Sequence, residues 1–216
     1  EIICKNFPKL ATISSRIVDV FLTFSSGGHS LEPAVNEEKD DLPQIQSTNP
    51  TNASNVGRTV STRDLLKLCN RSSTTFQVTS VECAYLVFQN CVDLFSSHLP
   101  AGQLKTDLIV SIGARLGIIE SRCVHMSNEY KPIARMTSDE FTIGRATLSR
   151  NSSEVSEKRI KMSENSEKPP TFSFTRVSSC VLERVAMSVQ QQEPVLLVGE
   201  TGVGKTSSVQ YLAYQT

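Results

Sequence analysis

A glycine-rich segment near the C-terminal end carries the residues best suited to chemistry. It reads Gly199-x-x-x-x-Gly204-Lys205-Thr206, with a further glycine at position 202. Glycines let the backbone turn so that its N–H groups converge, and a helix beginning near Lys205 adds the positive end of its dipole. In such loops the lysine reaches the β- and γ-phosphates of a nucleotide, and the hydroxyl that follows it ligates Mg²⁺.

The pattern therefore predicts a phosphate-binding loop with bound nucleotide and Mg²⁺, the metal being held by Thr206. The expected nucleotide-binding residues are Gly199, Glu200, Thr201, Gly202, Val203, Gly204, Lys205 and Thr206.

A strand and two helices must position this loop. The apolar run at residues 194–198 predicts a buried strand before it, and residues 205–213 are compatible with a helix after it. Upstream, four valines at steps of four, with Leu182 and Ala186 beside them, predict a helix that faces the coming sheet: Val177, Val181, Val185 and Val189.

An enzyme with such a loop also needs a second strand that ends in an acidic residue, which holds Mg²⁺ and places the attacking water. No apolar run ending in Asp or Glu follows Thr206, after which the sequence has ten residues. The upstream pair Asp139-Glu140 has the polar surroundings of a solvated turn. Because the sequence also begins at Glu1 without a Met, we expect a piece of a longer polypeptide that has no catalytic residue and does not hydrolyse ATP alone.

Composition bounds the function classes. The charges balance at 22 basic and 22 acidic residues, so nothing favours a nucleic-acid or anionic-membrane surface. No apolar run approaches the roughly 20 residues of a membrane span. The six cysteines are scattered, without a C-x-x-C pair or a His at zinc spacing, which favours buried free thiols in a reducing compartment.

Helical patterns dominate the first part of the chain. Residues 8–24 place apolar side chains at steps of three and four, and residues 61 to about 120 read as a compact all-helical unit. Between them, residues 25–59 are rich in Gly, Ser, Asn and acidic side chains, which predicts a mobile insertion. Two capping boxes mark helix starts: Ser61 with Asp64, and Thr79 with Glu82.

The pattern changes after residue 130. Phe141 to Leu148 alternates apolar and polar residues, which predicts one short strand with a bulge at Gly144. Residues 151–170 hold almost nothing apolar and much Ser, Glu and Lys, which predicts a flexible linker. The expected order is therefore helical unit, strand, linker, helix, strand, loop and helix.

Arg63 stands in the first turn of a predicted helix, where a cation opposes the helix dipole and gains nothing locally. Two explanations remain open from its position: a salt bridge with a neighbouring acid, or a contact with a phosphate.

Five segments together resemble the midasin family of AAA+ ATPases, at the junction between its first and second AAA modules. They are Arg58 to Arg71, Phe141 to Leu148, Leu182 to Ala186, and Glu193 to Thr206 with Val209 to Ala213. The resemblance covers residues 1–24, 56–148 and 172–216. It implies an α/β P-loop AAA+ fragment in which an all-helical lid subdomain precedes the incomplete start of a second module, namely helix, strand, P-loop and helix.

The resemblance also implies boundaries and roles. Residues 1–130 would be the lid of the preceding module, 131–150 a short β segment, 151–171 a linker, and 172–216 the start of the next module with its Walker A loop. Arg63 would be the sensor-2 arginine that contacts the first module's nucleotide. The family is described as nuclear, in the nucleolus and nucleoplasm, where it uses Mg-ATP to remodel pre-60S ribosomal particles and to release assembly factors during large-subunit assembly. Neighbouring AAA+ modules of the same chain would be its other partners.

Two alternatives remain from the sequence. The chain could belong to another P-loop ATPase of the MoxR or dynein type, which shares the order of lid and loop. It could instead be a helical interaction module at residues 61–130 that carries a degenerate, unused phosphate loop.

Overall fold

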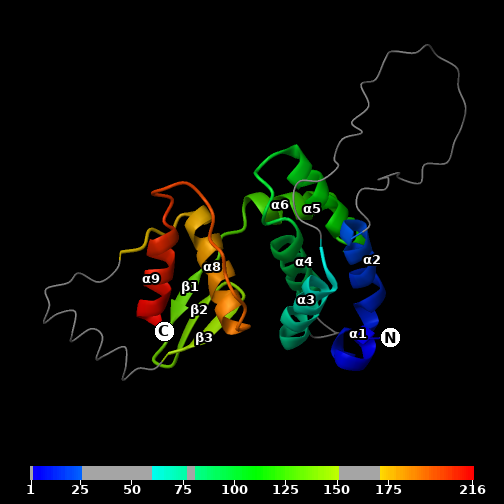
Figure 1. Cartoon of the computed structure of the whole chain (residues 1–216), viewed down its shortest axis with the longest axis horizontal. Coiled ribbons are helices and arrows are strands. Elements are labelled where there is room, and N and C mark those ends of the chain that lie inside the picture. Colours follow the sequence, from blue (N-terminus) through cyan, green and yellow to red (C-terminus); the bar gives the residue numbers. More distant parts are fainter. Residues whose placement is uncertain (1, 26–59, 77–80, 151–170) are drawn as a thin grey trace, which may run out of the picture. The chain divides into compact units, whose positions relative to one another are not determined.

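The computed structural model describes residues 2–25, 60–76, 81–150 and 171–216, and the chain divides into two compact units, Glu1–Val124 and His125–Thr216 (Figure 1). The predicted insertion and the predicted linker lie outside the described residues, except for Ser25 and Thr171 at their ends. Thr79 lies outside them as well, and with it the second predicted capping box.

The first unit is helical throughout its described part, as predicted. Its described elements are α1 Ile2–Asn6, the 3₁₀ helix η1 Pro8–Ile13, α2 Ser14–Ser25, α3 Thr62–Thr75, α4 Val81–Phe95, α5 Gln103–Leu116 and the beginning of α6 Glu120–Asn128. The helix predicted over residues 8–24 is divided at Ser14, whose hydroxyl donates to the carbonyl of Ala11 at 2.9 Å. In the parts of the chain described here, no helix combines the length and apolar character needed to cross a bilayer.

The apolar faces of these helices meet in one core. Ile17 and Val20 of α2 are fully buried, and Phe24 stacks on Phe95 of α4 with ring centroids 5.2 Å apart. Burial of each such side chain contributes roughly 1.5–3 kcal/mol. The predicted capping box at Ser61 is confirmed, because its N–H and its hydroxyl each donate to the Asp64 carboxylate at 2.9 Å.

The prediction of buried thiols is confirmed for four cysteines of this unit, Cys69, Cys83, Cys91 and Cys123, but it was wrong for Cys4, which is exposed, and Cys180 of the second unit is half-buried. Burial raises the pKa of the Cys69 thiol to about 11, because the thiolate loses its hydration. The same cause raises the pKa of Cys91 and Cys123.

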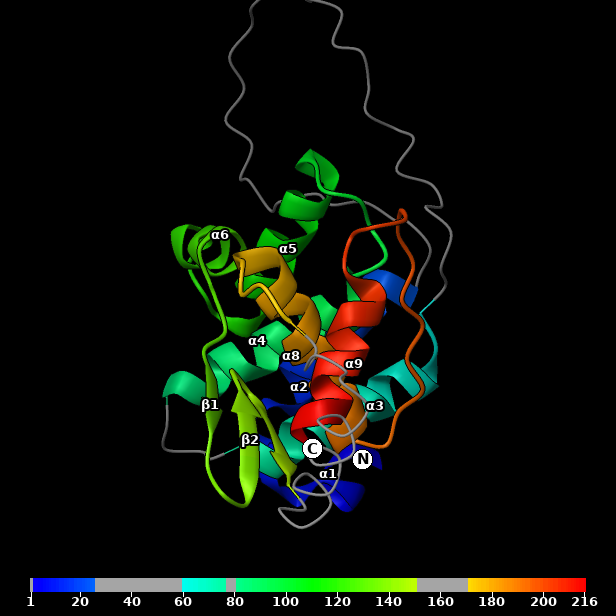
Figure 2. The same ribbon diagram turned by 90° about the vertical axis from the view of Figure 1, so that its left-hand side faces the viewer.

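The second unit is a three-stranded antiparallel sheet covered on one face by two helices (Figure 2). The strands are β1 Ala134–Met136, β2 Glu140–Ile143 and β3 Ala146–Ser149, and the helices are α8 Arg176–Gln190 and α9 Lys205–Gln215. Register pairs Phe141 with Leu148 and Ile143 with Ala146, so these four side chains share the covered face. Leu182 and Leu212 bring α8 and α9 onto it.

The prediction of one strand over residues 141–148 was wrong. The segment is the hairpin β2–β3, and Gly144 is not at a bulge but at the first central position of a two-residue turn, with φ of 53°. Arg145 follows with a negative φ, which is the pattern of a type II′ turn. Alternation of apolar and polar residues continues through such a turn, so the pattern could not reveal it.

The prediction that four valines of α8 face the sheet was wrong at both ends. Val177 and Val189 are exposed, whereas Leu182, Val185 and Ala186 are buried as predicted, and Ser179 and Glu183 complete the buried stripe with Leu182 and Ala186. An α-helix turns by about 100° per residue, so steps of four drift by about 40° each and the outer valines point about 120° apart. Residues spaced three and four apart stay on one face of a helix, and residues 179, 182, 183 and 186 of the buried stripe have that spacing.

The strand predicted at residues 194–198 does not form in this structure. The segment has neither helical nor strand pairing, and Leu196 and Val198 are 86% and 85% exposed. A strand exists through its hydrogen bonds to a neighbour. In the described part of the chain, the only sheet is the antiparallel β1–β2–β3, whose strands pair with one another and not with this segment.

Candidate nucleotide-binding site

The phosphate-loop residues form a turn that leads directly into α9. Gly202 and Gly204 both have φ of 86°, a backbone conformation that favours glycine, and Gly204 is the N-terminal cap of the helix. The predicted helix start at Lys205 is confirmed. The first bonds of the helix come from Ser208, whose N–H and hydroxyl donate to the Gly204 carbonyl at 3.0 and 2.8 Å.

The backbone N–H groups of this turn are available to a ligand. Within the described residues, the N–H groups of residues 200–207 donate no hydrogen bond. Those of the first turn of α9 have no intrahelical acceptor, because the preceding residues are outside the helix. Successive free donors beside the positive end of a helix dipole suit an anion such as a phosphate.

Lys205 brings a positive charge into the same turn. Its ammonium donates to the carbonyls of Gly199 and Glu200 at 2.8 and 2.6 Å, so the loop bends around the lysine side chain. Thr206, the predicted Mg²⁺ ligand, is exposed at the start of the helix. Residues from 199 to 206 are thus contiguous around one cation and a set of free donors, and this arrangement fits a phosphate group and the metal that accompanies it.

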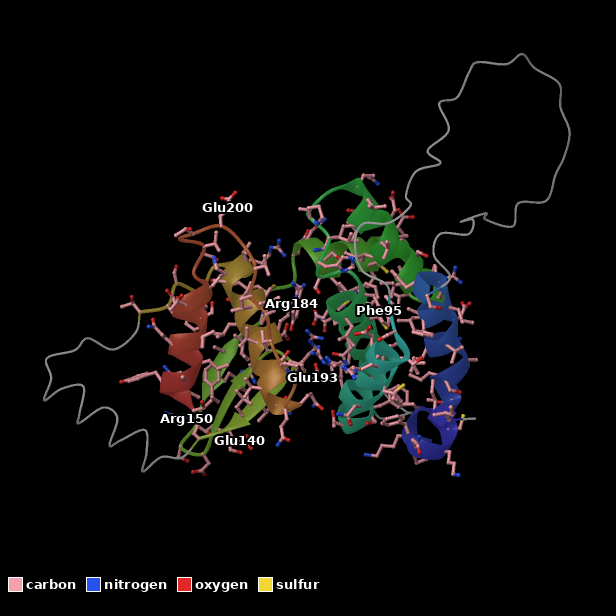
Figure 3. The ribbon with its side chains drawn as sticks, viewed as in Figure 1. Phe95, Glu140, Arg150, Arg184, Glu193 and Glu200 are labelled. Atoms are coloured by element: carbon pink, nitrogen blue, oxygen red, sulfur yellow. The ribbon has the colours of Figure 1, made fainter. Side chains whose placement is uncertain are left out.

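The acidic pair Asp139-Glu140 is not part of this turn. Both residues are exposed, and Asp139 lies in the turn between β1 and β2 as predicted, but Glu140 is the first residue of β2. Figure 3 shows Glu140 at the sheet, at the opposite end of the unit from Glu200 of the loop. The pair therefore supplies no carboxylate to the loop.

Arg63 lies in the other unit, at the second residue of α3. Its side chain is exposed and makes no hydrogen bond or ion pair with any residue that the structure describes. No acidic residue among those described therefore forms the salt bridge that would explain this arginine. An exposed guanidinium at a helix start remains free to bind an anion.

Sequence analysis did not find a buried charged cluster in the second unit. The carboxylate of Glu183 on α8 accepts from Tyr130 Oη at 2.7 Å and from the backbone N–H of Arg145 at 2.8 Å. The Arg145 guanidinium reaches both carboxylate oxygens, at 3.1 and 3.2 Å, and the two charged side chains are 2% and 6% exposed. The available signal was Glu183 itself, an acid placed among Leu182, Val185 and Ala186 on an apolar face.

Comparison with known proteins identifies the first unit. The family described as the Midasin AAA lid domain matches residues 1–119, which is more than half of the chain. The chain belongs to the midasin family. Midasin of Dictyostelium discoideum is 30% identical over 182 residues, an alignment that covers 73% of this chain. The chain spans about 3% of that relative's length, and no solved structure matches it.

Family membership decides between the classes of P-loop ATPase that remained as alternatives from the sequence. The described lid helices belong to a midasin-like AAA+ ATPase, and not to a MoxR or dynein type. The family match ends at residue 119, before the sheet and the phosphate loop of the second unit.

Proposed function

We propose that the second unit begins a further AAA+ module whose loop at residues 199–206 binds the phosphates of Mg-ATP. The observation that carries this proposal is the turn itself: free N–H groups of residues 200–207 beside the Lys205 ammonium and the N-terminal end of α9. Lys205 would neutralise phosphate charge, and Thr206 would hold Mg²⁺. When bound, the metal neutralises the charge that develops on the phosphates.

The same proposal gives the domain boundaries and the role of the first unit. Residues 1–130 are the lid of the preceding module, 131–150 and 172–216 belong to the next, and 151–171 link them. Arg63 contacts the nucleotide of the preceding module, which accounts for a cation at a helix start that pairs with no acid among the described residues. The exposed apolar segment 194–198 becomes a strand when neighbouring strands of its own module pair with it.

For the whole protein, we propose an ATP-driven machine that remodels pre-60S ribosomal particles and releases assembly factors in the nucleus. Support for this role comes from membership of the midasin family alone. We expect the chain of 216 residues to bind nucleotide weakly and not to hydrolyse it, because no described strand places a carboxylate beside the loop.

The test is to map nucleotide contacts at single residues. Mg-ATP is titrated into the ¹⁵N-labelled chain, and amide chemical shifts are followed by NMR, which detects weak binding. The expected result is a saturable shift confined to the amides of residues 199–208, and Mg-AMP, which lacks the β- and γ-phosphates, should not reproduce it. If up to about 10 mM Mg-ATP leaves these amides unmoved, the loop is degenerate and the helical interaction module becomes the better reading.

A further inference from the structure

The hairpin β2–β3, with Arg150 at its end, touches both helices that flank the segment from residue 191 to residue 204. We propose that this hairpin fixes the position of the phosphate loop, with Glu183, Arg145 and Arg150 as positioning residues. The proposal rests on the proposed function of the loop, and it assigns part of that function to residues that precede the loop in the chain and lie outside it.

The first attachment is to α8. Glu183 holds the hairpin turn through the backbone N–H and the guanidinium of Arg145. A Cβ added at Gly144 would lie 2.1 Å from Glu183 Oε1 and 2.6 Å from Tyr130 Oη, so the turn approaches the helix as closely as a glycine allows. A bidentate guanidinium and carboxylate, both buried, define one relative orientation of hairpin and helix.

A second contact holds the end of α8, next to the segment that leads to the loop. The N–H of Thr147 in β3 donates to the side-chain carbonyl of Gln190, the last residue of the helix, at 3.2 Å. The exit of the chain from α8 is therefore bonded to the hairpin as well.

The attachment to α9 is at the end of that helix furthest from the loop. Arg150 donates through Nε to the carbonyl of Gln215 at 2.7 Å, and its Nη1 donates to the carbonyl of Thr137 before β2. A cation at a helix C-terminus also opposes the negative end of the dipole. Figure 3 shows Arg150 at this end of α9 and Glu200 at the loop end.

Only one face of α9 is held by the unit. Ser208, Leu212 and Gln215 are buried at steps of four and three, and Tyr211 stacks on Phe172 with ring centroids 4.9 Å apart. Lys205 and Thr206 precede this stripe, and Thr206 is exposed. The loop therefore sits at the N-terminal end of a helix about 15 Å long, which the unit holds along one face from Ser208 to Gln215.

These contacts have a common consequence for the loop. The chain leaves α8 at a point bonded to the hairpin and re-enters a helix whose far end is bonded to the same hairpin. Both ends of the segment 191–204 are thereby fixed, although the segment itself pairs with no strand. The loop amides keep their orientation toward a phosphate because the hairpin holds the two helices together.

The experiment compares Arg150→Ala and Arg150→Lys in the whole chain, with Arg135→Ala as the matched control. Arg135 is an exposed arginine on β1 whose side chain makes no hydrogen bond or ion pair with another described residue. The first readout needs no nucleotide: the amide chemical shifts of residues 200–204, which lie at the other end of α9 from Arg150. We expect Arg150→Ala to move these amides, Arg150→Lys to restore them partly, and the control to leave them in place.

The second readout is the affinity for Mg-ATP, with Lys205→Ala as the reference. Arg150→Ala should weaken binding about tenfold, the value of one charge-assisted hydrogen bond. Shifts confined to residues 137–150 and 211–216, or full affinity in Arg150→Ala while Lys205→Ala loses it, would overturn the positioning role. If neither the wild type nor any variant responds to Mg-ATP, the proposed nucleotide function fails, and the loop shifts in the nucleotide-free chain still decide the role of the hairpin.

Discussion

Replacing Glu183 should destabilise the second unit more than any other single substitution of a charged residue in its described part. Its carboxylate accepts four hydrogen bonds, at 2.7, 2.8, 3.1 and 3.2 Å, and its side chain and that of Arg145 are almost completely buried. Glu183→Leu removes the carboxylate that accepts two hydrogen bonds from the buried guanidinium, and breaking a buried pair from one side costs about 3–5 kcal/mol of unfolding free energy.

The double variant Glu183→Leu with Arg145→Met separates the charge from the packing. Two apolar side chains of similar volume replace the ion pair, while the Arg145 backbone N–H and the Tyr130 hydroxyl lose the Glu183 acceptor, at about 1–3 kcal/mol together. The double variant should therefore be more stable than Glu183→Leu alone, by about 2 kcal/mol. A coupling of that size is expected only for residues in direct contact.

The assay is hydrogen exchange of the α8 and hairpin amides as a function of urea, which reports the stability of this unit separately from the lid. The exposed pair Asp19 and Arg115, with a contact of 2.9 Å, is the matched control in the other unit. Asp19→Asn should cost less than about 1 kcal/mol because water screens that pair. A Glu183→Leu variant as mild as Asp19→Asn, or a double variant as unstable as the sum of the single ones, refutes the reasoning.

Three further predictions concern single residues. Gly144→Ala should lower stability by about 1–3 kcal/mol in the same exchange assay, because its methyl group would meet Glu183 and Tyr130 at a positive φ. Because the pKa of Cys69 is raised in the folded lid, its thiol ionises at a lower pH in the unfolded chain than in the folded one. The free energy of unfolding of the lid, measured in urea titrations, should therefore fall by roughly 1 kcal/mol per pH unit between pH 9 and about 11. Cys69→Ala should lack this pH-dependent loss. Arg63→Ala should change lid stability by less than about 0.5 kcal/mol and reduce the nucleotide response only when the preceding module is present, and a fall of 2 kcal/mol would indicate a structural role.

Local signals predicted the helices well. Ser61 and Asp64 satisfy each other within four residues, so their cap could be recognised without knowledge of the rest of the fold. The helix start at Lys205 is equally local, since the glycines before it favour the turn and nothing after it breaks the helix.

Strands were predicted less well, because pairing decides them. Phe141 to Leu148 has the right alternation, but the division at Gly144 depends on β3 folding back onto β2 and on the approach of Glu183. Residues 194–198 have the composition of a buried strand and yet lie exposed, since their neighbours in a sheet are not supplied by the described chain. The partner of Glu183 could not be predicted either, since Arg145 lies 38 positions away.

The affinity of the chain for Mg-ATP before and after Lys205→Ala tests the central claim most directly. Lys131 is an exposed lysine of the same unit, so its substitution is the control. The wild type and Lys131→Ala should bind Mg-ATP with equal affinity. Lys205→Ala should bind about 10 to 100 times more weakly, because it removes one charged donor from the phosphates. Equal affinity of Lys205→Ala and the wild type would contradict the account.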